Sequence, residues 1–195
     1  MVRQGEPGAT LYVVAAGRLK VETQPGSADA VVLDILGAGD IFGELFFFTR
    51  RTPAANVVAL EPCELVAIDY RDLRGLIERR PTVAMALLEN LANRIILFGD
   101  SMRSFAVADL EARLSRRLCV LAETQGRKSE GAVILDLNLR QRDWARMSGV
   151  SREAVNRQFR TWSERGWVDL AGGEIRIRDL EALRDLADLA GLFTD

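Results

Sequence analysis

The chain has 195 residues, enough for one large domain or two small ones with separate hydrophobic cores. Charged residues make up 28% and apolar residues 48%, as in most globular proteins. No run approaches the roughly 20 apolar residues of a membrane span, and none near the start is long enough for a signal peptide. We therefore expect a cytoplasmic protein that does not associate with membranes, and the net charge of −2 argues against nucleic-acid binding through overall charge.

The residue types argue against an enzyme. The chain has no histidine, so it lacks the most common general base and every nucleophile pair that depends on histidine. Its two cysteines, Cys63 and Cys119, form no Cys-x-x-Cys motif, and we interpret both as small buried apolar residues. The carboxylates are dispersed, and no glycine-rich loop is followed by a phosphate-binding lysine. We expect no catalytic residues, no metal site and no identified cofactor.

The first eighty residues are typical of short strands separated by glycine, proline and aspartate. Several strands at this spacing predict an antiparallel roll or barrel. The expected strands are Thr10–Ala15, Arg18–Thr23, Val31–Ile35, Ala55–Ala59 and Glu64–Asp69. A short helix, Tyr70–Glu78, should follow and end before Pro81.

A long helix is predicted over Thr82–Ala106. Its apolar residues are spaced alternately by three and four, which indicates a heptad seam for pairing with a second copy of the chain: Leu88, Leu91, Ile95, Phe98, Met102 and Phe105. Packing of this helix against its own domain is the alternative. A further helix over about Ala108–Gln125 should begin with Asp109 as its N-cap.

The last third of the chain predicts two helices joined by a tight turn, followed by a hairpin. Residues 126–131 are expected to be a polar, flexible loop, and Val133–Leu137 a strand. Gly149 suits a turn that needs a positive φ, and Ser151 suits the N-cap of the second helix. The buried side chains should be Trp144, Ala145 and Met147 on the first helix and Ala154, Val155, Phe159 and Trp162 on the second. A hairpin around Gly172–Gly173 completes a winged helix-turn-helix pattern.

Positive charge is concentrated in this same segment. Residues 140–165 contain seven arginines and three acidic residues, a local net charge of +4, so the remainder of the chain carries −6. A basic segment within an acidic protein is the electrostatic pattern expected of an element that binds DNA.

Four motifs in the same order resemble the Crp/Fnr family (cyclic-AMP receptor protein/fumarate–nitrate regulator) over nearly the whole chain. They are QGEPGATLYVVAAGRLKV, GDIFGEL, CELVAID and MSGVSREAVNRQF. The resemblance implies an α+β fold: a cyclic-nucleotide-binding-like β-roll at residues 1–80, a dimerisation helix at 81–107 and a winged helix-turn-helix domain at 108–195. It also implies a homodimer that binds a pseudo-palindromic operator in double-stranded DNA and that contacts RNA polymerase.

The resemblance and the chemistry of the side chains together indicate a DNA-binding surface. Arginine can bond bidentately to guanine, glutamate can accept from the cytosine amino group, and a helix N-terminus suits phosphate. We expect base or phosphate contacts from the second helix, and phosphate contacts from two residues on the first. The predicted DNA-binding residues are Gln141, Arg142, Ser151, Arg152, Glu153, Asn156 and Arg157.

The resemblance implies a ligand cassette in which Gly43, Glu44, Leu45 and Phe98 are the candidate binding residues. Cyclic-nucleotide-binding members place an Arg-Ser pair about ten residues after the Gly-Glu pair, and here Pro53–Ala54 occupies that place. Proline has neither charge nor N–H to hold a cyclic phosphate. We therefore expect an effector other than cyclic AMP, or none, unless Arg50 or Arg51 substitutes. The apolar run Leu45–Phe48 is interpreted either as core or as a ligand wall.

By resemblance, the chain opens at the second or third strand of the roll. We expect either that the natural protein has further N-terminal residues, which in iron–sulfur members hold most cluster cysteines, or that its roll is incomplete. A regulator of transcription is the function predicted. The alternative is a small-molecule-binding protein whose DNA-binding element is vestigial.

Overall fold

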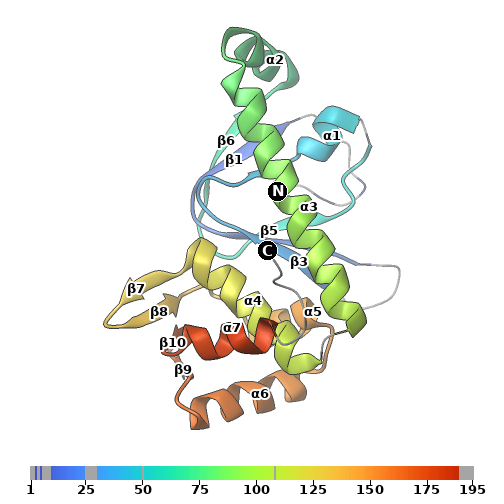
Figure 1. Cartoon of the computed structure of the whole chain (residues 1–195). Coiled ribbons are helices and arrows are strands. Elements are labelled where there is room, and N and C mark those ends of the chain that lie inside the picture. The colour runs from blue at the N-terminus through green and yellow to red at the C-terminus, as the bar shows by residue number, and fades with distance from the viewer. Residues whose placement is uncertain are drawn as a thin grey trace. The chain divides into compact units, whose positions relative to one another are not determined.

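The computed structural model describes residues 3, 5, 10–24, 30–49, 51–107 and 109–188. The chain forms two compact units, Met1–Leu97 and Phe98–Asp195, and the boundary between them falls inside one long helix. Figure 1 labels the helices and strands of each unit. The finer division at residues 80 and 107 stays a prediction.

The N-terminal unit consists of two antiparallel sheets followed by helices. One sheet has the order β4-β1-β6 and the other β3-β2-β5. The strands are β1 (Leu11–Ala16), β2 (Leu19–Thr23), β3 (Val31–Leu36), β4 (Ile41–Phe42), β5 (Asn56–Ala59) and β6 (Glu64–Ile68), and the helices are α1 (Glu44–Thr49), α2 (Tyr70–Arg79) and α3 (Thr82–Val107). The antiparallel roll predicted from the sequence is confirmed. Its strand ends shift by one residue, and the short elements β4 and α1 were not predicted.

Apolar side chains of the two sheets form the core of this unit. One cluster joins Val14, Leu19, Leu36, Phe42 and Val57, and the ring of Tyr12 stacks on that of Phe42 with centroids 4.9 Å apart. A second cluster joins the sheet to the helices through Leu11, Ile41, Leu73 and Leu87. This second cluster is the packing that seats α2 and the start of α3 against the roll.

Helix α3 is apolar over much of its length but mostly exposed. Although no uninterrupted apolar run reaches 20 residues, the window Thr82–Gly99 is long and apolar enough, by length and composition, to cross a membrane. Glu89 and Arg94 interrupt that window.

The C-terminal unit contains the remaining helices and one four-stranded antiparallel sheet of order β7-β8-β10-β9. Its elements are α4 (Leu110–Gln125), β7 (Arg127–Ser129), β8 (Ala132–Leu135), α5 (Gln141–Ser148), α6 (Arg152–Glu164), β9 (Val168–Ala171), β10 (Glu174–Ile177) and α7 (Leu180–Asp188). Asp109 caps α4 as predicted, and its carboxylate accepts the N–H of Ala112 at 2.9 Å. The winged helix-turn-helix arrangement is confirmed.

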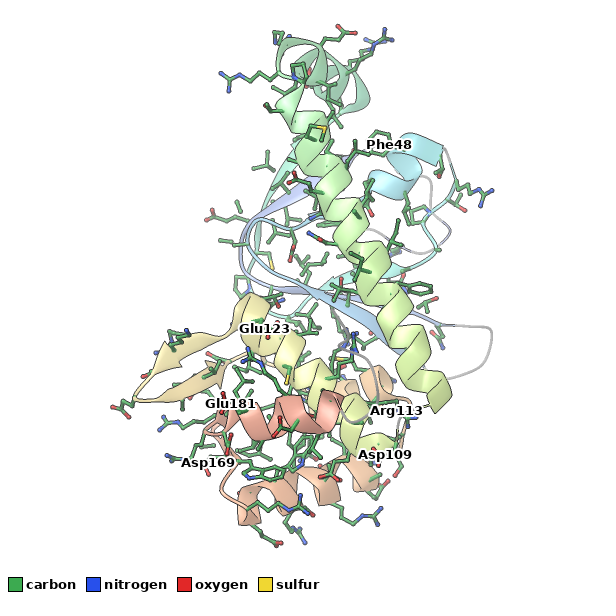
Figure 2. All side chains as sticks on the ribbon, viewed as in Figure 1. Phe48, Asp109, Arg113, Glu123, Asp169 and Glu181 are labelled. Atoms are coloured by element: carbon green, nitrogen blue, oxygen red, sulfur yellow. The ribbon has the colours of Figure 1, made fainter. Side chains whose placement is uncertain are left out.

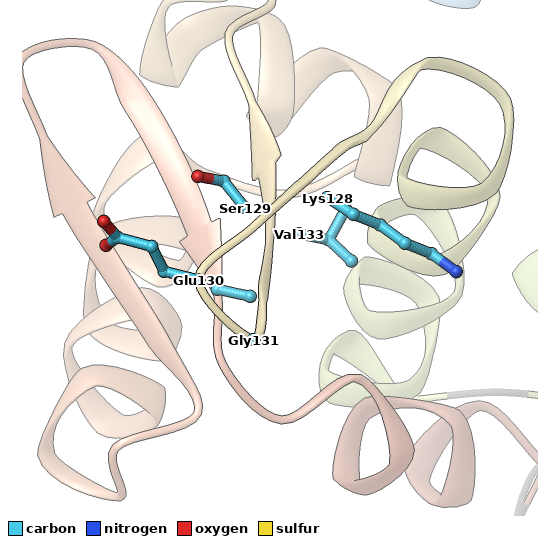
Figure 3. A pocket seen from close by; sticks show the side chains of 6 residues that line it. Lys128, Ser129, Glu130, Gly131 and Val133 are labelled. Atoms are coloured by element: carbon cyan, nitrogen blue, oxygen red, sulfur yellow. The ribbon is translucent and has the colours of Figure 1, made fainter.

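The segment after α4 corrects the sequence analysis. Residues 126–131 were expected to be a flexible loop, yet Arg127–Ser129 form β7, which pairs with β8. The polar composition concealed the strand because β7 is an edge strand with two exposed residues, and Glu130 and Gly131 make the turn with φ of 50° and 76°. The hollow at this hairpin is lined only by residues 128–133 and opens to solvent (Figure 3), so we assign no ligand to it.

Candidate functional site

The first helix of the helix-turn-helix presents a buried face and a polar face. On α5, Trp144, Ala145 and Met147 are buried as predicted. The buried carboxylate of Asp143 accepts the backbone N–H of Arg140 at 3.0 Å, which stabilises the start of the helix. Gln141 and Arg142, the predicted phosphate-binding residues, are exposed in the first turn. Both are therefore free of the core and accessible to a polyanion.

A tight turn sets the geometry between α5 and α6. Gly149 ends α5 with φ 67°, ψ 35°, the left-handed conformation that glycine adopts without steric cost. Ser151 then caps α6, and its hydroxyl accepts the N–H of Ala154 at 3.2 Å. These two conformations fix where α6 begins, and hence which residues form its first turn.

Aromatic packing holds α6 in place from behind. The ring of Phe159 contacts that of Trp144 edge-on at 5.8 Å between centroids and that of Trp162 at 5.9 Å. Val155, Phe159 and Trp162 are at most 2% exposed, and Ala154 is half-buried. Edge-to-face ring pairs are well-defined contacts, so this stripe fixes the position of the opposite face of α6.

That opposite face carries the residues predicted to bind DNA. Ser151, Arg152, Glu153 and Arg157 are exposed, and Asn156 is half-buried. The N–H of Glu153 itself, the hydroxyl of Ser151 and the charge of Arg152 lower the pKa of the Glu153 carboxyl, in that order of importance. The Glu153 side chain is therefore a carboxylate at neutral pH, the form that accepts a hydrogen bond from a cytosine amino group.

The hairpin that follows α6 forms the wing. Strands β9 and β10 pair from Val168–Ile177 to Ala171–Glu174, and Arg178 bonds Asp169 at 2.6 Å between Nε and Oδ2. The guanidinium of Arg165 lies 4.9 Å from the ring centroid of Trp167, at the junction of α6 and the wing. Helix α6 and the wing are thus held together at this junction.

One carboxylate contacts α6 from another helix, and sequence analysis missed it. Glu111, in the first turn of α4, accepts bonds on the same oxygen, Oε1, from three side chains. The distances are 3.0 Å to Nε2 of Gln158, 3.0 Å to Nε1 of Trp162 and 3.4 Å to Nη1 of Arg165. The only sequence signal was a buried tryptophan that needs an acceptor, and nothing in the sequence identified Glu111 as that acceptor.

The ligand cassette of the N-terminal unit is built around two of the predicted residues. Gly43 has φ 89°, and a Cβ there would lie 2.4 Å from the carbonyl oxygen of Thr10, so only glycine fits. The next residue, Glu44, is only 4% exposed. Its Oε1 lies 2.7 Å from Nη1 of Arg94 on α3. Sequence analysis did not predict that Arg94 would meet this carboxylate.

The rest of the cassette is apolar and open. Leu45 and Phe48 on α1 are exposed, and Figure 2 labels Phe48 on that short helix. Pro53 lies in a coil, where its carbonyl accepts the N–H of Gly5 at 2.9 Å. Arg51 is exposed, whereas Arg50 and the side chains of Phe46 and Phe47 lie outside the described residues. Phe98, the fourth candidate, is exposed and belongs to the C-terminal unit.

The predicted dimer seam is exposed along α3. Ile95 is 72% exposed, Leu88 58% and Phe98 64%, while Leu91 is half-buried. The side chains of Met102 and Phe105 lie outside the described residues. Exposed apolar residues of this size at heptad spacing form a surface that a soluble protein covers with a partner.

The described residues form no cluster of side chains suited to binding a metal ion. Among those residues, no group of three or more histidine, cysteine, aspartate or glutamate side chains could hold a metal ion. Neither cysteine forms a disulfide: Cys119 is buried, and the thiol of the half-buried Cys63 lies 3.3 Å from the carbonyl oxygen of Arg18.

Comparison with protein families identifies both halves of the chain. Residues 1–80 match the family described as "Cyclic nucleotide-binding domain", and residues 112–186 match "Crp-like helix-turn-helix domain". A CRP-like cAMP-activated global transcriptional regulator of Mycobacterium tuberculosis is 31% identical over 180 residues, 92% of this chain and 80% of that protein. A cyclic AMP receptor protein of Thermus thermophilus is 30% identical over 184 residues, 94% of this chain and 82% of that protein.

Solved structures show the same fold. FixK2 from Bradyrhizobium japonicum superposes with a TM-score of 0.83 at 18% identity, covering 95% of this chain and 91% of the other. A transcriptional regulator of the CRP/FNR family from Thermus thermophilus superposes with a TM-score of 0.78 at 22% identity, covering 96% and 93%. At these identities the likeness establishes the architecture alone.

Proposed function

We propose that this chain, which belongs to the Crp/Fnr family of DNA-binding transcriptional regulators, acts as a homodimer that reads a pseudo-palindromic operator. The observation that supports the proposal most directly is the exposed face of the first two turns of α6. Arg152, Glu153 and Arg157 are exposed there, on a helix whose other side is held by aromatic packing. The basic segment and the tight turn before α6 support the same role.

Within that surface we assign two kinds of contact. Arg152, Glu153, Asn156 and Arg157 lie on the face that enters the major groove, where they meet base edges or nearby phosphates. Gln141 and Arg142 on α5, with Ser151 and the N-terminus of α6, bind phosphates. Phosphate contacts set position and affinity, while base contacts set sequence preference.

The dimer is formed through α3. Its exposed residues Leu88, Ile95 and Phe98 repeat at heptad spacing, and Leu91 completes the described part of the seam. The apolar residues of this seam contribute to the composition by which α3 resembles a membrane span, and we propose that a second copy of the chain covers them rather than a lipid bilayer. A dimer places two α6 helices in successive major grooves, about 34 Å apart along B-DNA.

We infer further that the effector is not cyclic AMP. Pro53 and Ala54 stand where the family resemblance implies an arginine and a serine, and neither can neutralise a cyclic phosphate. The carboxylate of Glu44 is buried and already paired with Arg94. The exposed apolar residues Leu45 and Phe48 favour an apolar ligand instead.

Calorimetric titration of the full-length protein with cyclic AMP tests this inference. We expect no saturable heat up to millimolar nucleotide. Micromolar binding would overturn the inference, and loss of that binding in Arg51→Ala would show that Arg51, exposed in the same coil, supplies the missing charge.

Random-site selection with the purified protein, followed by gel shifts at several salt concentrations, tests the DNA-binding role. We expect enriched sequences with two half-sites separated by about one helical turn. The alternative function, a small-molecule-binding protein with a vestigial reader, predicts no enriched sequence. We assign no enzymatic activity, a cytoplasmic location, and RNA polymerase as the partner through which bound protein acts on transcription.

A further inference from the structure

Glu111 links α4 and α6 within the C-terminal unit through side-chain hydrogen bonds. Its single oxygen Oε1 accepts bonds from Gln158 and Trp162 on α6 and from Arg165, the C-cap of that helix. Trp162 is fully buried, so its indole N–H has no access to water and depends on this acceptor. Removing the carboxylate would leave that donor buried without its acceptor.

The three donors lie on one face of α6. Residues 158, 162 and 165 are spaced by four and three, so at 3.6 residues per turn they point the same way. Residues 152, 153, 156, 157 and 160 fall on the opposite face by the same count, and all five are exposed or half-buried. Glu111 therefore holds the back of the helix whose front carries the DNA-reading side chains.

Glu111 lies close in the chain to the end of α3, so its contact with α6 is near the proposed dimerisation helix. It lies in the first turn of α4, two residues after the N-cap Asp109, and α3 ends at Val107. Figure 2 shows Asp109 and Glu123 at opposite ends of α4. Glu111 therefore joins α6 to the end of α4 at which the chain leaves the proposed dimerisation helix.

We propose that Glu111 is a positioning residue that sets the rotation of α6 about its own axis, and thereby the preference for operator over other DNA. Non-specific binding needs only positive charge near phosphates, so it tolerates a rotated helix. Base readout needs side chains that meet hydrogen-bond geometry, so it does not tolerate a rotated helix. The inference rests on the proposed function, because it presupposes that α6 reads bases.

The test compares full-length variants for binding to the selected operator and to an unrelated duplex at one salt concentration. Glu111→Ala should weaken operator binding tenfold or more and change binding to the unrelated duplex by about twofold or less. Glu111→Gln keeps an acceptor oxygen for Trp162 and Gln158, so it should restore most of the preference. Glu123→Ala is the matched control, because Glu123 is on the same helix but bonds Arg184 of α7, 2.8 Å away.

Two further measurements keep the proposal testable if Glu111→Ala folds poorly. Gln158→Ala removes one donor from the half-buried side of α6, and it should reduce operator preference several-fold at an unchanged melting temperature. The indole N–H resonance of Trp162 in an NMR spectrum should shift in Glu111→Gln and stay in place in Glu123→Ala. An unchanged Trp162 resonance in Glu111→Gln would contradict the hydrogen bond between Trp162 and Glu111.

The outcomes separate this proposal from the function on which it rests. If the wild-type protein prefers an operator and Glu111→Ala keeps that preference, or weakens all DNA binding equally, the positioning role is wrong and the function stands. If the wild-type protein itself shows no preference for any duplex, both fail.

Discussion

Helix α6, which we propose reads DNA, and helix α1 of the cassette each begin with residues that match a family motif, but their chemistry differs. At α6, the charged side chains stand exposed on a helix that is packed from behind. At α1, the matching carboxylate of Glu44 is buried against Arg94, and the exposed residues among those described are Leu45, Phe48 and Thr49. A family motif is thus present at both places, but its charged side chains are exposed only at α6.

A motif match can reflect a requirement of the fold or a requirement of binding. Gly43 is kept by the backbone, because any Cβ would meet the carbonyl of Thr10. Its presence therefore reports on the fold of the roll and says nothing of the ligand. Arg152 is exposed at the start of α6, its charge lowers the pKa of the Glu153 carboxyl, and its proposed role is to bind DNA.

The largest expected effect concerns the surface that brings two copies of α6 together. Ile95→Asp places a charge in the exposed apolar seam, and we expect monomers in sedimentation experiments. Operator affinity should fall about 100-fold or more, because two half-sites are no longer bound jointly. Glu89→Gln, on the same helix outside the seam, should leave the mass unchanged. A dimeric Ile95→Asp would contradict the assignment of α3.

The next effect concerns the cassette. Arg94→Met leaves the Glu44 carboxylate buried without its cation, and unpairing a buried charge costs about 3 kcal/mol or more. Urea unfolding should show this loss. The double variant Glu44→Gln/Arg94→Met removes the charge as well and should recover most of the stability. If Arg94→Met left the free energy of unfolding unchanged, the Glu44–Arg94 pair would not stabilise the cassette, and the contrast with α6 would weaken.

The reading surface itself should show a smaller, more selective effect. Arg152→Ala should cost about 1–3 kcal/mol of operator binding and relax preference at one base position. Arg142→Ala should weaken binding to all sequences alike and lower the salt dependence. Competition gel shifts against single-base variants of the operator measure both. Equal losses on every sequence in both variants would refute the division between base and phosphate contacts.

The smallest effect is the pH dependence of the start of α6. The pKa of Glu153 lies below its ordinary value of 4.5 in the folded chain. Its contribution to stability is therefore present above pH 4.5 and is lost as the pH falls through the folded value. Glu153→Gln should flatten the acid side of the stability profile slightly, whereas Glu164→Gln near the other end of α6 should not. Identical profiles for wild type and Glu153→Gln would contradict this.

The sequence predicted what local patterns determine. The turn at Gly149, the cap at Ser151 and the buried stripe of α6 follow from short-range spacing, and the structure confirms all three except that Ala154 of the stripe is half-buried. Helix α1 and strand β4 were not predicted, because α1 has only six residues and β4 only two, too few to show a periodic pattern. The strand β7 escaped because an exposed edge strand can be polar throughout.

The contacts that define the sites could not be read from the sequence. Glu111 meets Trp162 across 51 positions, and Glu44 meets Arg94 across 50. No local rule links residues so far apart, because each pairing depends on how whole helices pack. Sequence analysis could identify Trp162 as a buried side chain and Glu44 as a candidate ligand residue, but not the partner of either.

The exposed side of α3 has one more consequence. In the proposed dimer the apolar residues of α3 are covered only when two chains meet, so folding and association would be linked by mass action. The thermal midpoint of the protein should then rise with protein concentration, and dilution alone should weaken operator binding without any effector. The amount of protein in the cell would itself be a regulatory signal, acting through the same helix that aligns the two readers.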